Sequence, residues 1–211
     1  LDGALTNNTA AVTVGNGTLA ANGTIAASSI DVQGGANLTT GEAERLSAGV
    51  ALNADGTVSL GGDETIGDLS GSGIITNNGN GLTVNQTSDT AFTGNITGAG
   101  GLTKQGEAGL TLTNGSDFTG EANINAGTLT VSGLLATNTI NVANGATLNT
   151  TAADLLSDAA TLTNDGTLNI GGDQTLTNLL GSDSGAVNIG SNTLQLTGGV
   201  DFQGRINGAQ G

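Results

Sequence analysis

The chain has 211 residues, of which 38 are Gly and three are Phe, and it contains no Pro, Cys, Met, Trp, Tyr or His. Without His or Cys it has no Ser–His or Cys–His nucleophile pair and no imidazole or thiolate metal site. Eighteen acidic and three basic residues give a formal net charge of -15, which argues against a nucleic-acid partner and against anionic membranes. A hydrophobic fraction of 36%, mostly aliphatic, predicts a folded chain with a narrow core.

The first ten residues are polar and rich in Thr and Asn, unlike a signal peptide. No apolar run in the chain approaches the roughly 20 residues that a membrane-spanning helix needs, so we expect no membrane insertion. The chain is therefore expected to be a mature product or a segment of a longer protein.

An internal repeat dominates the sequence. Residues 17–101 align with residues 127–211 at a constant offset of 110 (127 − 17), and residues 102–126 join the two copies. Thus GTLAANGTIAASSIDVQGGANLTT, from Gly17, corresponds to GTLTVSGLLATNTINVANGATLNT, from Gly127. We expect residues 1–211 to form one continuous structure, because no net insertion separates the copies.

Short phrases within each copy alternate between aliphatic and polar residues. GTLTV at Gly127, NTINV at Asn138 and GTLNI at Gly166 place Leu, Ile or Val two residues apart, which predicts strands with one buried face. The best helical candidates are residues 41–50 and their counterparts 151–160. Each is predicted to be either a short helical turn or a loop.

Short strands separated by Gly and Asn are found in β-sandwiches, in barrels and in β-solenoids. Uniform mid-sized aliphatic residues and repeated Asn-Gly or Gly-Gly corners favour an all-β, parallel β-solenoid, whose corners need Gly and Asn. With roughly 20 residues per coil and about 4.8 Å between strands, we expect about ten coils and a rod roughly 50 Å long. Each copy should then contain about five coils.

The segment from Ile96 to Gly133 carries the most specific motif, ITGAGGLTKQGEAGLTLTNGSDFTGEANINAGTLTVSG. It resembles the passenger-associated repeat of bacterial autotransporters, GxGGLxKxGxGxLxLxGxNxYTGxTxVxxGxLxVxG. The chain departs from this pattern at Glu107-Ala108 and has Phe118 where the family commonly has Tyr. The matching positions are Gly98, Gly100, Gly101, Leu102, Lys104, Gly106, Leu110, Leu112, Gly120, Gly127, Leu129 and Val131.

This resemblance implies a right-handed parallel β-helix at the bacterial cell surface or outside the cell. It does not imply one activity, because such passengers include adhesins, proteases, esterases and inert stalks.

Candidate chemistry is confined to carboxylates. Asp63 and Glu64 are adjacent, so a strand would point them to opposite faces, and their counterparts are Asp173 and Gln174. Sugar-cleaving β-helices need clustered carboxylates, and the calcium-binding nonapeptide GGxGxDxUx does not occur. We therefore predict no enzyme activity, no catalytic residue, no cofactor and no metal site, and read these acids as turn-forming residues on a solvated face.

The aromatic and basic residues are also interpreted structurally. Phe92, Phe118 and Phe202 occur in the same Phe-x-Gly phrase, which favours a core position over a binding hot spot. Lys104 and Arg205 are predicted to be surface groups that relieve the acidic field.

The leading hypothesis is a non-catalytic stalk, fibre or filament subunit. Its partner would be itself, stacked head to tail, or neighbouring repeats of a longer chain, because neither end of the sequence resembles a cap. The alternative hypothesis is an adhesin that binds a host protein or glycan through the side of the rod.

Overall fold

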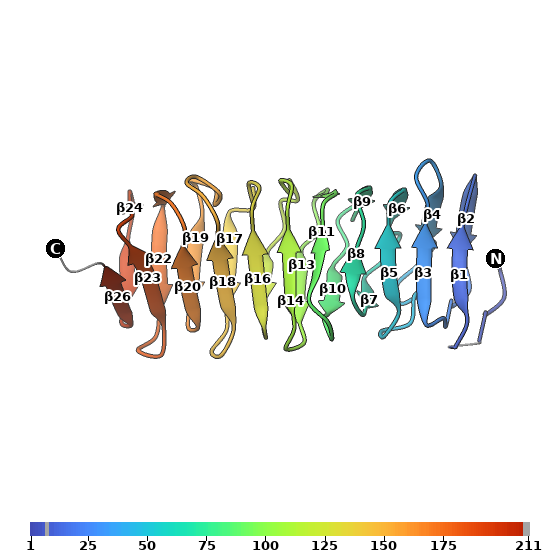
Figure 1. Cartoon of the computed structure of the whole chain (residues 1–211), viewed down its shortest axis with the longest axis horizontal. Helices are drawn as coiled ribbons and strands as arrows, with labels where there is room; N and C mark the ends of the chain where they lie inside the picture. Colours follow the sequence, from blue (N-terminus) through green and yellow to red (C-terminus); the bar gives the residue numbers. More distant parts are fainter. Residues whose placement is uncertain (7–8, 209–211) are drawn as a thin grey trace.

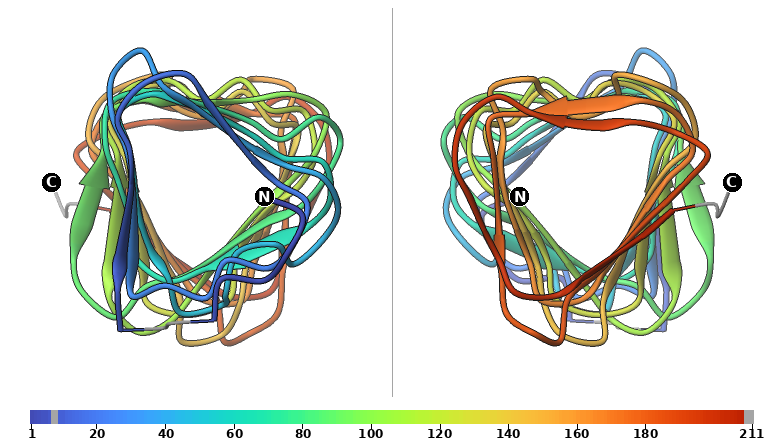
Figure 2. Two further views of the ribbon diagram at one scale, coloured as in Figure 1. Left: turned by 90° about the vertical axis from the view of Figure 1, so that its right-hand side faces the viewer. Right: turned by 90° about the vertical axis from the view of Figure 1, so that its left-hand side faces the viewer.

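The chain forms an elongated stack of coils with strands β1 (Ala11–Val14) and β26 (Arg205–Gly208) at opposite ends of the stack (Figure 1). A computed structural model describes residues 1–6 and 9–208, and this part contains 26 strands and no helix. Viewed along the stack, the coils superimpose as a triangle (Figure 2). The predicted all-β, parallel β-solenoid of about ten coils is therefore confirmed.

Each side of the triangle is a parallel sheet, and we number these sides face 1, face 2 and face 3. Face 1 runs the whole length of the stack, with the Gly71–Phe92 bridge joining β8 to β11. Its strands are β1 (Ala11–Val14), β3 (Ser29–Val32), β5 (Ala51–Ala54), β8 (Leu69–Ser70), β11 (Thr90–Phe92), β14 (Gly109–Leu112), β16 (Thr128–Val131), β18 (Thr147–Thr150), β20 (Thr167–Ile170), β23 (Ala186–Gly190) and β26 (Arg205–Gly208).

The other two faces each include coils where a single bridge replaces a strand. Face 2 contains β2 (Thr18–Ala21), β4 (Asn37–Thr40), β6 (Thr57–Ser59), β9 (Ile74–Thr76) and β12 (Asn95–Thr97), then the bridges Ser116–Leu135–Leu156, then β21 (Gln174–Leu176) and β24 (Leu194–Leu196). Face 3 begins with the bridges Leu5–Ile25–Leu46 and continues with β7 (Glu64–Ile66), β10 (Leu82–Asn85), β13 (Leu102–Gln105), β15 (Ala122–Ile124), β17 (Thr139–Val142), β19 (Thr161–Asn164), β22 (Asn178–Gly181) and β25 (Val200–Phe202).

Strict register keeps one set of side chains inside the triangle. In β3 and β5, for example, Ile30 pairs with Leu52 and Val32 with Ala54, and all four are buried. Because side chains alternate along a strand, the intervening Thr, Asn and Ser residues face outward. The result is a thin core of stacked aliphatic residues, as the period-two phrases predict.

The two repeat copies do not lie on the same faces. Leu19, in β2, belongs to face 2, and its counterpart Leu129, in β16, pairs with Leu110 on face 1. Likewise Ile30 lies on face 1, whereas its counterpart Ile140 lies on face 3. The second copy is thus turned by one face, a third of a turn, relative to the first.

The coil length explains this turn. Ala11 and Arg205 occupy equivalent positions on face 1 and lie ten coils apart. Dividing the number of residues between them by ten gives a coil slightly shorter than the roughly 20 residues that we expected for such a repeat. The offset of 110 between the copies, which includes the joining residues 102–126, therefore equals about five and two-thirds coils. With roughly 4.8 Å per coil, equivalent residues are about 27 Å apart along the rod.

The helical candidates 41–50 and 151–160 are loops containing turns. Each loop has one non-glycine residue with positive φ, Glu44 at 53° and Asp154 at 52°. The loops bulge from the stack where only a single bridge, at Leu46 or Leu156, continues the sheet.

Candidate functional site

Corner aspartates bond to the backbone of the following coil. Asp63 Oδ1 accepts a hydrogen bond from the Gly81 amide at 2.7 Å, and its counterpart Asp173 accepts one from the Thr193 amide at the same distance. Asp55 and Asp165, also equivalent between the copies, accept the amides of Ser72 and Ser182. These carboxylates bind one coil to the next, as an acceptor at a turn does.

Asp55 and Asp165 are held in the ionised form by these contacts. Hydrogen bonds from Ser72 lower the pKa of Asp55, and those from Ser182 lower the pKa of Asp165. Asp63 and Asp173 lie on different coils, about 27 Å apart along the rod by the coil spacing. The structure therefore does not bring Asp63 together with its counterpart Asp173.

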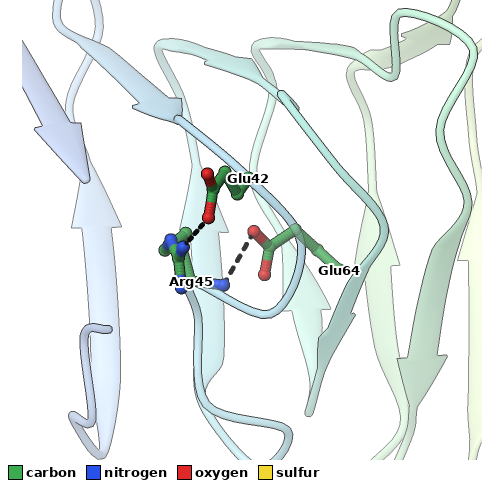
Figure 3. A network of polar contacts seen from close by, with 3 residues as sticks. All are labelled: Glu42, Arg45 and Glu64. Atoms are coloured by element: carbon green, nitrogen blue, oxygen red, sulfur yellow. Dashed lines mark hydrogen bonds and ion pairs between the residues drawn. The ribbon is translucent and has the colours of Figure 1, made fainter. Parts of the chain in front are cut away.

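Glu64 points the other way from Asp63 and is buried, with 1% of its surface exposed, so the prediction of a solvated position was wrong for this residue. Its Oε1 accepts the Arg45 amide at 3.0 Å and its Oε2 accepts the Leu46 amide at 2.9 Å. Figure 3 shows the Arg45 contact, together with the ion pair that Arg45 makes with Glu42 in the same loop. Burial raises the pKa of Glu64, although the two amides oppose that effect.

Gln174, the counterpart of Glu64 in the second copy, makes equivalent contacts with the backbone. Its Oε1 accepts the Leu155 and Leu156 amides at 3.1 Å each, and its Nε2 donates to the Ala152 carbonyl at 2.7 Å. Both side chains therefore satisfy buried amides of the bulging loop that precedes them. A neutral amide suffices for this role.

We expect Glu64→Gln to raise the thermal unfolding temperature at pH 7 and to leave it unchanged near pH 4. The pKa of Glu64 in the folded state lies above its ordinary value of 4.5, so the folded state holds more protons in the window between them. Stability from this group is consequently lost as pH rises through that window. Melting curves from pH 4 to pH 8 measure the difference.

The reciprocal change, Gln174→Glu, is the matched control. A carboxylate there would face the Ala152 carbonyl instead of donating to it, so we expect a loss of about 1–3 kcal/mol at pH 7. The loss should shrink in acid. This account would be contradicted if the unfolding temperatures of both variants and of the natural chain changed with pH in the same way.

Lys104 is not a surface group, and our prediction for it was wrong. It is fully buried in β13, between Val84 and Ile124 of the neighbouring coils. Its Nζ donates to the carbonyls of Gln105 and Gly106 at 2.8 Å and to that of Ala126, on the next coil, at 3.0 Å. All three donors of the ammonium are used, so the lysine joins two successive corners from the inside.

Burial lowers the pKa of Lys104, while the charges of Glu107 and Asp89 act in the opposite direction. No carboxylate in the described part of the chain forms an ion pair with it. Arg205, in contrast, is exposed on β26, as predicted.

The phenylalanines belong to the core. Phe92 and Phe118 are completely buried, and Phe202 is partly buried. The glycine of the Phe-x-Gly phrase has a steric cause, because a Cβ on Gly94 would lie 2.0 Å from the Gly73 carbonyl oxygen and one on Gly204 would lie 2.1 Å from that of Gly185, in the preceding coil. The core interpretation of Phe92 and Phe118 is confirmed.

An asparagine ladder follows the outer side of face 1 in the second half of the rod. Asn169 donates to Asn149 at 2.8 Å, Asn188 to Asn169 at 2.7 Å and Asn207 to Asn188 at 2.8 Å. Such amide ladders are a known stabilising feature of in-register parallel sheets. The sequence signal was present, as an Asn in the middle of successive strands, but the pairing depends on the register.

The asparagine ladder does not extend through the middle of face 1. In the same outward column the residues are Ala91, Thr111 and Thr130. Here the face is hollowed into a shallow groove of about 540 Å³, rimmed by Asp89 and Glu107. Among residues 1–6 and 9–208 no group of three or more acidic residues is placed to hold a metal ion.

Comparisons with protein-family models, curated proteins and solved structures found no match to this chain. Separately, no helix in the described residues is long and apolar enough to cross a membrane.

Proposed function

We propose that the chain is a non-catalytic structural segment of a bacterial surface or secreted protein, acting as a stalk, fibre or filament subunit. The observation that carries this proposal is the parallel stacking of face 1 from β1 to β26, which passes through the single Gly71–Phe92 bridge between β8 and β11 and a bulge at Asn188–Gly190. A stack of this kind gains length with each added coil and keeps its cross-section, which is what a spacer requires.

The extracellular assignment rests on the sequence. Residues 96–133 resemble the passenger repeat of autotransporters, and within this segment Lys104 and Gly106 take part in one hydrogen-bonded corner. This gives two of the motif positions a physical role in stacking coils.

Contact with a further coil is supported by the last described coil. Val200 and Ile206 are 58% and 50% exposed there, although their strands place them at positions that are buried in the preceding coils. Strands β24, β25 and β26 each pair on one side only. Unpaired strand edges beside apolar residues favour the addition of another strand, from the same polypeptide or from a second copy.

Antibody labelling of intact cells of the source bacterium tests the proposal. We expect labelling without permeabilisation, and removal of the label when intact cells are treated with protease. Labelling only after permeabilisation would contradict an extracellular stalk.

The second candidate function is an adhesin that binds through the side of the rod. The groove on face 1 favours it, because it hollows the outer surface beside the regular asparagine ladder of the second half of the rod.

A further inference from the structure

The groove on face 1 has two small residues on the outer side of its strands. Ala91 occupies the column of the asparagine ladder, and Gly109 occupies the neighbouring column, where Thr128 follows in the next coil. They lie in a shallow, solvent-open hollow of about 540 Å³ across β11, β14 and β16.

The polar groups around this hollow have hydrogen-bonding capacity to spare. Asp89 uses Oδ1 to accept the Gly109 amide at 2.6 Å, which fixes the side chain and leaves Oδ2 available. In the described part of the chain, no hydrogen bond is made by the carboxylate of Glu107 or by the hydroxyls of Thr111 and Thr128. The groove thus offers carboxylate acceptors on one rim and hydroxyls, which donate and accept, on the other.

The electrostatic setting of the groove differs from that of the rest of this acidic rod. One of the chain's three basic residues, Lys104, is buried beside it, and its ammonium interacts with the charges of both Asp89 and Glu107. The ammonium also holds the Gln105 and Gly106 carbonyls, in the corner that leads into Glu107. The lysine therefore fixes this corner and offsets part of the negative charge at the rim.

We propose that the groove between Asp89, Glu107 and the threonines of β14 and β16 is a binding site for a neutral, hydroxyl-rich ligand, namely an oligosaccharide without acidic groups. Carboxylates and threonine hydroxyls match the paired hydroxyls of a sugar, whereas a sialic or uronic acid would be repelled by the rim and by the net charge of the rod. A cationic peptide fits less well, because Lys104 already offsets part of the rim charge. No Tyr or Trp is present to stack on a sugar ring, so the affinity should be weak.

This proposal rests on the second candidate function, an adhesin that binds through the side of the rod, and names its ligand class; it does not depend on how rods assemble. Saturation-transfer NMR on the full chain is the test, with three probes: a panel of neutral hexose and N-acetylhexosamine oligosaccharides, their sialylated forms, and oligolysine. We expect saturable binding of at least one neutral oligosaccharide and none of its sialylated form.

Two leucine substitutions locate the site. Ala91→Leu fills the floor of the groove from an exposed position and should weaken binding at least tenfold. Ala186→Leu adds the same side chain to the outer side of face 1, away from the groove, and should leave binding unchanged. Absence of saturable binding by any neutral oligosaccharide, binding that survives Ala91→Leu, or binding of oligolysine alone would each overturn the proposal, while rods of normal shape would still support the structural function.

Discussion

Replacing Gly100 with Ala should lower the free energy of unfolding by about 3 kcal/mol or more, the upper range for overpacking in a closely packed interior. A Cβ at this position would lie 1.7 Å from the carbonyl oxygen of Asn80, in the preceding coil. The two coils would have to separate, and the 2.8 Å hydrogen bond from the Gly100 amide to Asn77 Oδ1 would be strained. Urea unfolding followed by circular dichroism measures the loss.

Gly49→Ala is the control for this substitution. Gly49 is exposed, has no positive φ, and its added Cβ would meet no atom within 4 Å. We expect a change within about 0.5 kcal/mol. Equal effects of the two substitutions would show that the coils do not approach each other as closely as described.

Phe92→Ala should cost about 3–5 kcal/mol, because it removes a fully buried ring and leaves a cavity in a thin core. The ring is enclosed by its own coil and by β14 of the next coil, in which Leu112 pairs with Phe92. The same unfolding measurement applies.

The equivalent residue of the second copy provides the comparison. Phe202 follows the same Phe-x-Gly phrase but is only partly buried, since no described coil covers it. Phe202→Ala should therefore cost clearly less than Phe92→Ala. A larger loss at Phe202 would mean that this end of the rod is covered in solution.

The strands were predictable because each depends on a few neighbouring residues. GTLTV at Gly127 and NTINV at Asn138 alternate in character, and the strands Thr128–Val131 and Thr139–Val142 bury their Leu, Ile and Val side chains as that alternation requires. The stacking of identical short units also follows from the repeat.

The rotation between the copies was not predictable, because it depends on the lengths of all the corners together. Along face 1, Ile30 pairs with Leu52 and Leu52 pairs with Leu69, so the second of these two coils is clearly shorter than the first. Coils of unequal length still close one triangle, since the extra residues bulge into loops. Only the sum of these lengths determines that the second copy starts two-thirds of the way around a coil.

Two features of the candidate site were misjudged or missed for related reasons. In the phrase Leu102-Thr103-Lys104, period two places Lys104 on the same inward face as Leu102, but we predicted a surface position from its charge. The burial was missed because the three carbonyls that accept hydrogen bonds from its ammonium come from two coils. Glycines were expected at the corners for their φ angles, and ten described glycines do have positive φ, but Gly100 is required instead by the close approach of Asn80. Contacts between coils are not visible in the sequence.

Negative-stain electron microscopy of the purified, tag-free chain tests most directly the claim that both repeat copies form one continuous rod. The account predicts narrow particles of uniform width, about 50 Å long for ten coils at the strand spacing of a parallel sheet, either isolated or joined end to end into fibres of the same width. Rounded particles, or two lobes separated near residues 102–126, would contradict it.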